Sequence, residues 1–383
     1  MVEERGILLD IVLEREPTRS SEVFYNPAMR TDRDISAAVL GVYARRCGEA
    51  LRVGDVLAGT GIRGLRYARE VPQVDRVVLN DANPQAVAKI RQHLLLNRCP
   101  PERFQVEQRN AHAFLATFMG HFHVLDLDPY GSFIPFLDMA VQSLRRGGLL
   151  GLVATDLAVP FGVYPETSLR RYGVVSVRTS FSYEAMLRIY LRAVVEACAR
   201  HDRAYVPWIT FYERHHVRLM GVVLNDAQQA TWQRKRMGFI WHCPRCDWRQ
   251  MDEDSGLGPS SGSGGWGECP LCGGSVRAIG PLWLGELGQQ EVVEEALAWL
   301  QERGYGEAAR LVERLRDEIP LPLPYYDTHA LAQRLKTDPP NLRRLIRRLR
   351  AQGFQAVRSH CCPEGLKTDA PYDVLCHLVR GEA

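Results

Sequence analysis

Val53-Gly54-Asp55-Val56-Leu57-Ala58-Gly59-Thr60-Gly61-Ile62-Arg63-Gly64 is the stretch of this chain that decides the fold. Its first half is an apolar run that predicts a buried strand, and its glycine-rich second half is typical of a tight turn into a helix. Outward from this unit the chain keeps alternating, with further strands predicted at 76–80, 104–106, 122–126 and 149–155. Such alternation predicts an α/β protein with a doubly wound, mostly parallel Rossmann-like sheet.

The segments around this sheet complete the predicted domain plan. A long helix at 183–200 precedes two β-rich runs, at 205–212 and 217–224, which we interpret as a hairpin that closes the sheet. Residues 1–50 are expected to form an irregular segment and then a helix capped by Asp34. The plan has three parts: an α/β domain at 1–225, a cysteine-bearing module at 226–280 with a flexible Gly/Ser insert at 255–267, and a mainly helical α+β domain at 281–383.

The composition excludes several classes of protein. A chain of 383 residues is too long for one ordinary core. No run of roughly 18 apolar residues occurs, so no transmembrane helix is expected, and residues 1–5 lack the basic and apolar regions of a secretory signal. We therefore expect a cytoplasmic protein in a reducing compartment, and a monomer.

The basic residues are almost all arginine. Only four of the 48 are lysine, and the net charge of +3 names no partner by itself. A genome rich in G and C explains most of this bias. Arginine is nevertheless the better residue for bidentate phosphate contacts and for stacking on bases.

The glycine turn and the next strand end form a candidate cofactor site. Gly59 and Gly61 would let a ligand approach the backbone closely, beside Asp55. Asp81, at the end of the next predicted strand, can accept both hydroxyls of a ribose. A nicotinamide dinucleotide also fits such a pattern, but the turn lacks a full G-x-G-x-x-G.

A second informative stretch, Asp126-Leu127-Asp128-Pro129-Tyr130-Gly131-Ser132, follows the predicted strand at 122–126. The proline cannot extend the ladder, so the chain leaves the sheet there and presents a carboxylate and a ring at its edge. Asp128 can accept hydrogens from a nucleobase amine, and Tyr130 offers a flat face to the base. The simpler alternative for Asp128 is that it only caps a turn. For Asp126, a direct role in the site and a role that only supports the site are equally good interpretations.

Together, the glycine turn, the acid one strand later and the Asp-Pro-Tyr segment resemble the class I S-adenosylmethionine-dependent methyltransferases. Many members carry an acid after the third strand, which meets the adenine amino group. Here Asn110, followed by Ala111, would use its side-chain oxygen instead. Asp128 would orient the amine of the base and take its proton as the methyl group arrives.

Five segments in this order resemble one family closely, the tRNA (guanine-26-N2)-dimethyltransferases of archaea, eukaryotes and a few bacteria. The resemblance covers nearly the whole chain and rests on residues 23–27, 60–68, 126–132, 280–285 and 359–369. It implies methylation of the N2 amine of guanine 26 in tRNA, once or twice, with S-adenosylmethionine as the methyl donor. Some bacterial members also accept guanine 27.

The resemblance also implies roles for single residues. Asp128 would be the catalytic acid residue, Tyr130 a base-stacking ring, and Tyr25 with Asn26 a second wall beside the target. The cofactor would be held by Arg33, Arg63 and Asp81. This chain departs from the family pattern in having tyrosine at 25 and 130, where phenylalanine is frequent, and Asn110 in place of an acid.

Two close pairs of cysteines predict a structural zinc site. Cys243-Pro-Arg-Cys246 and Cys269-Pro-Leu-Cys272 are C-x-x-C turns, and proline and glycine near both pairs fit tight ligand turns. Four thiolates from paired turns suit tetrahedral zinc and leave no open position for catalysis. Four unrelated buried cysteines or a redox pair would explain this double spacing less well.

The segment 341–350 predicts a basic helix. Its leucines and isoleucine fall on one face, and arginines crowd the others: Arg343, Arg344, Arg347, Arg348 and Arg350. With a first helix at 328–335 it would form a winged-helix-like pair. A charged face is often only solvated, but given the enzyme interpretation we expect contacts to tRNA phosphates, with Lys367 as a second candidate.

Two other classes of protein stay open at this point. A DNA amino-methyltransferase acting on adenine or cytosine would use a similar motif, but a second proline is expected before its ring. A zinc-ribbon nucleic-acid-binding protein with an inactive methyltransferase domain is disfavoured by the intact Asp128, Asp81 and glycine turn.

Overall fold

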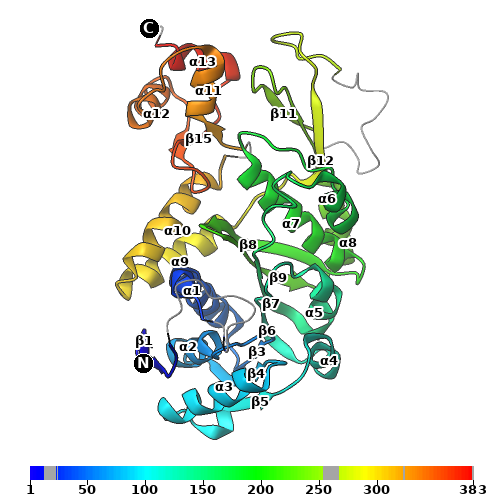
Figure 1. Cartoon of the computed structure of the whole chain (residues 1–383), viewed down its shortest axis with the longest axis vertical. Helices are drawn as coiled ribbons and strands as arrows, with labels where there is room; N and C mark the ends of the chain where they lie inside the picture. The colour runs from blue at the N-terminus through cyan, green and yellow to red at the C-terminus, as the bar shows by residue number, and fades with distance from the viewer. Residues whose placement is uncertain (13–22, 24, 253–266, 322–323, 382–383) are drawn as a thin grey trace.

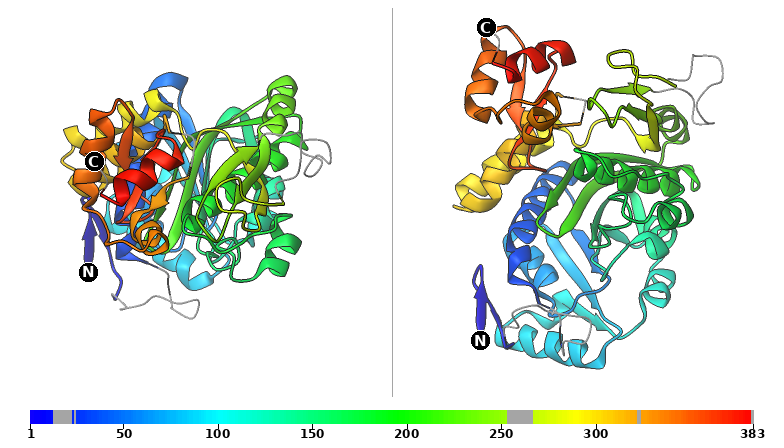
Figure 2. Two further views of the ribbon diagram at one scale, coloured as in Figure 1. Left: turned by 90° about the horizontal axis from the view of Figure 1, so that it is seen from above. Right: turned by 45° about the horizontal axis from the view of Figure 1, so that its top comes forward.

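The computed structural model describes residues 1–12, 23, 25–252, 267–321 and 324–381. A large α/β body carries the N-terminus. Two smaller units, a cysteine-bearing module and a C-terminal module, stand side by side at the opposite end of the molecule (Figure 1, Figure 2). Of the predicted insert at 255–267, only Gly267 is among the described residues.

The body is built on a seven-stranded sheet that confirms the predicted fold class. The order of its strands is β5 (Phe104–Glu107), β4 (Val74–Asn80), β3 (Leu51–Asp55), β6 (Phe122–Leu127), β7 (Leu144–Ala154), β9 (His216–Leu224) and β8 (Ala204–Glu213). The first five are parallel, whereas β9 is antiparallel to both β7 and β8. The predicted hairpin therefore closes one edge of the sheet.

Helices cover both faces of this sheet, and each face has its own apolar core. One core holds residues of α4 (Ala111–Thr117), α5 (Leu137–Ser143) and α7 (Ser182–Ala199). The other holds residues of α1 (Arg30–Cys47), α2 (Ile62–Glu70) and α3 (Pro84–Leu96). Neighbouring residues of β6 alternate between the two, since Val124 lies in the second core and Leu125 in the first.

The N-terminal segment is more ordered than the sequence predicted. Strands β1 (Val2–Glu4) and β2 (Ile7–Leu9) form a hairpin, with Arg5 and Gly6 at φ of 52° and 79° in its turn. The expected cap at Asp34 is wrong, because a 3-10 turn (Pro27–Met29) capped by Asn26 leads into α1 at Arg30. Asp34 lies buried within α1 and pairs with Arg5 and Arg66.

The segment after the cysteine-bearing module returns to the body. Helices α9 (Gln290–Glu302) and α10 (Gly306–Glu318) pack against α1 and contribute to its core. The predicted boundary at 280 falls inside β12 (Arg277–Trp283). These two amphipathic helices bury their apolar faces on α1 and β8, and α10 also contacts residues 356–358, which follow it, so the predicted third domain stays a prediction.

The two smaller units each have a three-stranded antiparallel sheet. In the cysteine-bearing module, β10 (Met237–His242) lies between β11 (Arg249–Asp252) and β12. In the C-terminal module, residues 324–381, β15 (Gly365–Thr368) lies between β13 (Tyr326–Asp327) and β14 (Ala356–Arg358). That sheet packs with α11 (Thr328–Leu335), α12 (Leu342–Ala351) and α13 (Tyr372–Val379) around a core of its own. Within the described residues, no helix is long and apolar enough to cross a membrane.

Candidate active site

The ends of three neighbouring strands form the floor of a narrow cleft. β3 is parallel to β4 and to β6, and Asp55 is in register with Leu79 on one side and Asp126 on the other. The side chains of Asp81 and Asp128, which follow β4 and β6, therefore lie at the same edge of the sheet. The cleft is lined by Tyr25, Asn26, Met29, Arg33, Asp55, Leu57, Ala58, Gly59, Thr60, Ile62, Arg63 and Asp128.

The glycine turn keeps its backbone open to this cleft. Gly59 and Gly61 have φ of 54° and 78°, in the left-handed region that favours glycine. The Gly59 N–H donates to Asp81 Oδ2 at 2.9 Å, and Asp81 Oδ1 accepts from the Asn83 N–H at 2.9 Å. Each carboxylate oxygen has a second acceptor position, so Asp81 can still accept ribose hydroxyls.

Asp128 is held from one side by Arg63. Its Oδ2 lies 2.7 Å from Arg63 Nη2, and its side chain is 20% exposed whereas that of Arg63 is 5% exposed. Burial raises the pKa of the Asp128 carboxyl above its ordinary value, and Arg63 opposes that rise without cancelling it. One oxygen is thus anchored, and the carboxylate lines the cleft with a greater tendency to accept a proton than an ordinary aspartate.

Sequence reasoning missed a buried cluster of charges beneath Asp128. Arg63 also pairs with Asp32 at 2.8 Å and with Asp126 at 3.4 Å. Asp126 in turn accepts from the Tyr67 hydroxyl at 2.7 Å and pairs with Arg218 at 2.5 Å. Asp126 is therefore a support for the site, and the cluster fixes the Arg63 guanidinium that holds Asp128.

The N-terminal hairpin forms a second wall through Glu4. Glu4 accepts from the Tyr25 hydroxyl at 2.8 Å and from Arg33 Nε at 2.8 Å. Burial alone would raise the pKa of Glu4, but Arg33 and Arg66 hold it at about 2. Arg33 lines the cleft, as expected of a cofactor contact, yet part of its guanidinium is already engaged with Glu4.

Asn26 lines the cleft, and Tyr130 follows Asp128 by two residues. Tyr130 is 50% exposed, and it precedes Gly131, whose N–H donates to Thr155 Oγ1 at 2.8 Å. Asn26 Nδ2 lies 3.0 Å from Nε2 of His215, in the β8–β9 turn. Sequence reasoning missed His215 as a neighbour of the cleft, because a turn between two strands carries no signal of what it faces.

Unmet polar groups in the cleft fit a nucleoside-bearing cofactor. Asp55 Oδ2 and Thr60 Oγ1 are buried and have no hydrogen-bond partner among the described residues. Burial and the neighbouring charge of Asp126 raise the pKa of Asp55 to about 8, so this carboxyl can donate as well as accept. Together with the open glycine turn and Asp81, these groups suit the hydroxyl-rich and cationic parts of S-adenosylmethionine.

The position after the third strand has a structural role in addition to the expected one, which stays a prediction. Asn110 is the N-cap of α4, and its Oδ1 accepts from the Ala113 N–H at 2.8 Å. The oxygen that we expected to face adenine thus accepts one bond in a helix cap and keeps a second acceptor position. Ala111, the first residue of α4, is buried beside it.

The four predicted zinc ligands converge in the cysteine-bearing module. The sulfurs of Cys243, Cys246, Cys269 and Cys272 all lie within 4.8 Å of one another. Two sulfur–sulfur distances are 3.5 Å, close to the roughly 3.8 Å that a tetrahedral site with Zn–S bonds of about 2.3 Å requires. The donor set fits a structural zinc ion.

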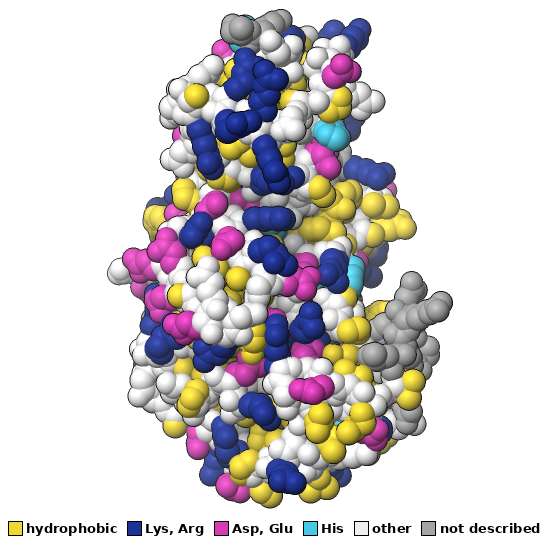
Figure 3. Space-filling view, turned by 90° about the vertical axis from the view of Figure 1, so that its left-hand side faces the viewer, with side chains coloured by type: hydrophobic (Ala, Val, Ile, Leu, Met, Phe, Trp, Pro, Cys, Tyr) yellow, Lys and Arg dark blue, Asp and Glu magenta, His cyan; other side chains and the backbone are white. Residues whose placement is uncertain are grey.

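The predicted basic helix is present, with its arginines outward. Arg343, Arg344 and Arg347 are exposed on α12, and Arg348 is half-buried. Figure 3 shows basic side chains gathered over the C-terminal module. The other predicted phosphate contact, Lys367, differs from expectation: it is buried, and its Nζ lies 3.2 Å from Glu184 Oε1 because the module docks there.

A doubly wound sheet with an antiparallel hairpin at one edge, a glycine turn, an acid after β4 and an Asp-Pro-Tyr segment after β6 defines a class I methyltransferase. The comparisons identify the family: residues 10–380 match the profile of the N2,N2-dimethylguanosine tRNA methyltransferases, described as TRM. The chain belongs to this family.

Named relatives agree over most of their length. A tRNA (guanine(26)-N(2))-dimethyltransferase of Methanopyrus kandleri is 38% identical, over 93% of this chain and 89% of that protein. The enzyme of that name from Pyrococcus furiosus is 32% identical, over 94% of this chain and 93% of that protein. A solved structure described as Trm1 from Pyrococcus horikoshii with S-adenosyl-L-methionine is 30% identical, with a TM-score of 0.83 over 94% of this chain and 95% of that one.

Proposed function

We propose that this chain transfers methyl groups from S-adenosylmethionine to the exocyclic N2 of guanine 26 in tRNA, giving N2-methylguanosine and then N2,N2-dimethylguanosine. The observation that carries the proposal is Asp128, a partly exposed carboxylate that lines the cleft between the glycine turn and Tyr25. Relatives whose names state this activity match nearly the whole chain, which supports the same substrate position here.

The reaction needs an activated amine. The N2 lone pair of guanine is delocalised into the ring, so the free amine is a weak nucleophile. S-adenosylmethionine, when bound, supplies a methyl group on a sulfonium that leaves as a neutral thioether. Asp128, anchored by Arg63 on one oxygen, accepts N–H groups of the guanine edge and holds the lone pair in line with the methyl group.

Asp128 also takes the proton that the amine loses as the N–C bond forms. The burial that raises its pKa makes it a better proton acceptor than an ordinary aspartate, and such general-base help contributes on the order of 10²–10⁴-fold. A second methylation needs the carboxylate ionised again. Its partial exposure gives water a route to remove that proton.

The target guanine must leave its stack, because in a duplex its Watson–Crick edge is paired and the faces of its amine are covered by the neighbouring bases. Turning a nucleotide out costs a few kcal/mol. Stacking on an aromatic ring, worth roughly 1–3 kcal/mol per base, can offset this cost. Tyr130, which is half-exposed beside Asp128, is the ring that we assign to this contact, with Tyr25 on the opposite wall.

The rest of the tRNA would lie along the arginine face of α12. Arg343, Arg344 and Arg347 project from the C-terminal module on one helix. Guanidinium groups bind phosphate in a bidentate manner and read no sequence by themselves. We therefore assign substrate positioning to α12 and chemistry to Asp128.

Labelled-methyl incorporation into unmodified tRNA transcripts tests the proposal. A transcript with guanine at 26 should take up label, and replacing that guanine by adenine should abolish the uptake. A matched transcript with guanine 27 replaced shows whether the neighbouring position is also used. Incorporation into duplex DNA but not into tRNA would reject the proposal in favour of a DNA amino-methyltransferase.

A further inference from the structure

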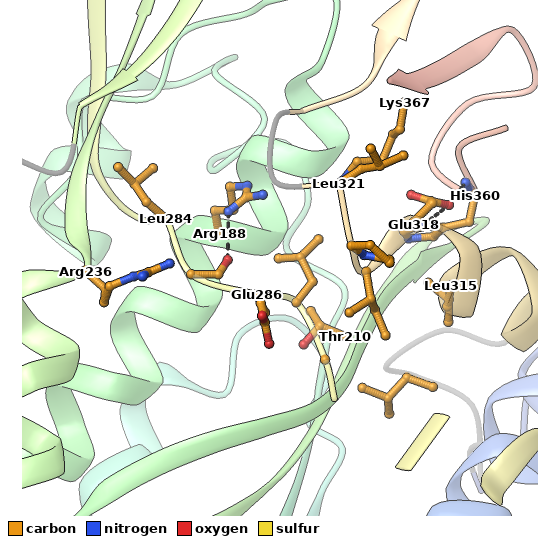
Figure 4. A pocket seen from close by; sticks show the side chains of 16 residues that line it. Arg188, Thr210, Arg236, Leu284, Glu286, Leu315, Glu318, Leu321, His360 and Lys367 are labelled. Atoms are coloured by element: carbon orange, nitrogen blue, oxygen red, sulfur yellow. Dashed lines mark hydrogen bonds and ion pairs between the residues drawn. The ribbon is translucent and has the colours of Figure 1, made fainter. Parts of the chain in front are cut away.

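The body and the C-terminal module enclose a cavity of about 260 Å³ where they meet. Lys367 and His360 reach this cavity from the module, and Arg188 and Glu318 reach it from the body (Figure 4). Apolar side chains, Tyr325 and Cys361, pack across this junction, and buried polar bridges around the cavity add to them in fixing the two units relative to each other.

Glu184 of α7 makes the first bridge. Its Oε1 lies 3.2 Å from Lys367 Nζ and 2.8 Å from Arg188 Nη2, and its Oε2 accepts from the Tyr325 N–H at 3.2 Å. Burial opposes ionisation, but Lys367 and Arg188 keep the pKa of Glu184 below its ordinary value. A charged carboxylate of the body thus binds both β15 of the module and the chain that enters it.

Glu318, at the end of α10, makes the second bridge. It accepts from Ser359 Oγ at 3.2 Å and from His360 Nδ1 at 2.9 Å. The other ring nitrogen of His360 accepts from the Tyr212 N–H of β8 at 3.3 Å. Both bridges end on the segment 359–369, one of the segments on which the family resemblance rests.

The module has its own core, so its position does not follow from its folding. The cluster that contains Leu345 and Leu349 of α12, Leu366 of β15 and Leu375 of α13 is separate from the two cores of the body, whereas Tyr325 and Cys361, at the junction, belong to the first core of the body. α12 is thus rigid within the module. Any small movement at the junction would be transmitted to the arginine face as a whole.

We propose that the Glu184–Lys367 pair sets the distance from the arginine face of α12 to Asp128, and thereby selects which guanine of the tRNA is methylated. The inference rests on the proposed function. The tRNA would bind through its phosphates at α12 and react at Asp128, so the distance between these two sites decides which nucleotide reaches Asp128. Adjacent nucleotides are only a few ångströms apart along a strand, so a small change in this distance is enough to change the target. Lys367 is a positioning residue, since it is buried away from the cleft.

Lys367→Met in the full chain tests this inference. Arg188 remains to neutralise Glu184, so the variant retains a paired carboxylate. With a transcript that carries guanine at both 26 and 27, the ratio of methylation at 27 to that at 26 should rise roughly tenfold, within the range of a lost coupling between two sites. Lys367→Arg keeps the charge and should stay near the wild-type ratio.

The ratio separates positioning from plain destabilisation. A merely structural Lys367 would lower both products together and leave their ratio unchanged, which would overturn the inference. Lys336→Met is the matched control, because Lys336 is an exposed lysine of the same module, and its ratio should not move. If Lys367→Met does not fold, Glu184→Gln, which keeps the shape of the side chain, should give the same shift.

The wild-type protein distinguishes the two levels of failure. If it methylates neither guanine, the proposed function fails before the variants are compared. If it methylates guanine 26 and the folded variants keep its ratio, only the role of the Glu184–Lys367 pair fails.

Discussion

Oδ2 of Asp128 and Nη2 of Arg63, two residues that line the cleft, lie 2.7 Å apart. This ion pair orients the Asp128 carboxylate. It does not fully balance its negative charge, because Arg63 also pairs with Asp32 and Asp126. A reacting group held by a buried, shared cation is restricted in rotation before any ligand binds. Preorganisation of this kind is what an in-line transfer needs.

Replacing Asp128 by Asn tests the proton-accepting role. The amide keeps the shape of the side chain but cannot take a proton, so methyl incorporation should fall by about 10²–10⁴-fold. Titration calorimetry should show S-adenosylmethionine binding retained. Asp138→Asn, at an exposed pair with Arg200, is the control and should turn over normally. Full activity of Asp128→Asn would remove this residue from the mechanism.

Tyr67→Phe probes the buried cluster beneath the site. The hydroxyl lost is the one that donates to Asp126 at 2.7 Å, and hydrogen bonds to charged groups contribute about 1.5–3 kcal/mol. Urea unfolding should show a loss of this size. Tyr164→Phe, on the exposed start of α6 (Pro165–Tyr172), should change the free energy of unfolding by less than about 0.5 kcal/mol. Equal effects of the two changes would argue that the cluster does not stabilise the fold.

Asp55 predicts a defined pH dependence. Its pKa rises from 3.8 to about 8 on folding, so the protonated form stabilises the native state below pH 4 and that contribution is lost as the pH rises to about 8. The wild type should therefore lose stability relative to Asp55→Asn as the pH rises from 4 to about 8, because asparagine does not titrate. Denaturant titrations of both proteins at several pH values measure the difference, and a constant difference would contradict the shifted pKa.

Cys243→Ser tests the metal site. Loss of one of four thiolates should lower zinc content, measured by atomic absorption, and lower the unfolding temperature more than it changes S-adenosylmethionine binding. Cys47→Ser, outside the cluster, should keep both properties. A folded Cys243→Ser protein with undiminished zinc would show that this thiolate is not a ligand.

The arginine face of α12 predicts a salt signature. Removing one phosphate contact reduces the slope of log affinity against log salt by about 0.7–0.9. The double variant Arg343→Gln, Arg347→Gln should thus weaken tRNA binding and reduce that slope by nearly twice the value for one contact. Filter binding at several salt concentrations gives the slope, with Lys336→Gln as the control. Unchanged slopes would place the tRNA elsewhere.

Local sequence patterns were enough to predict most of the fold and part of the candidate site. The strand–turn–helix unit at 53–64, the segment 126–132 and the cysteine pairs were readable because their chemistry lies within a few consecutive residues. The charge cluster was not, since Asp32, Arg63, Asp126 and Arg218 come from α1, α2, β6 and β9 and meet only in three dimensions.

Lys367 shows that a local pattern can also predict a contact that the structure does not have. A lysine in a polar tail normally faces solvent, so the sequence favoured a phosphate contact for Lys367. Its true partner, Glu184, lies 183 positions earlier in the chain. No window of sequence could contain both residues.

The return of α9 and α10 to α1 has a consequence for how the protein is made. On the ribosome, α1 emerges early, but the helices that cover its apolar side are translated only after the cysteine-bearing module. The nascent chain must therefore carry this side of α1 uncovered until α9 and α10 have been made, and exposed hydrophobic surface of this kind is prone to aggregation.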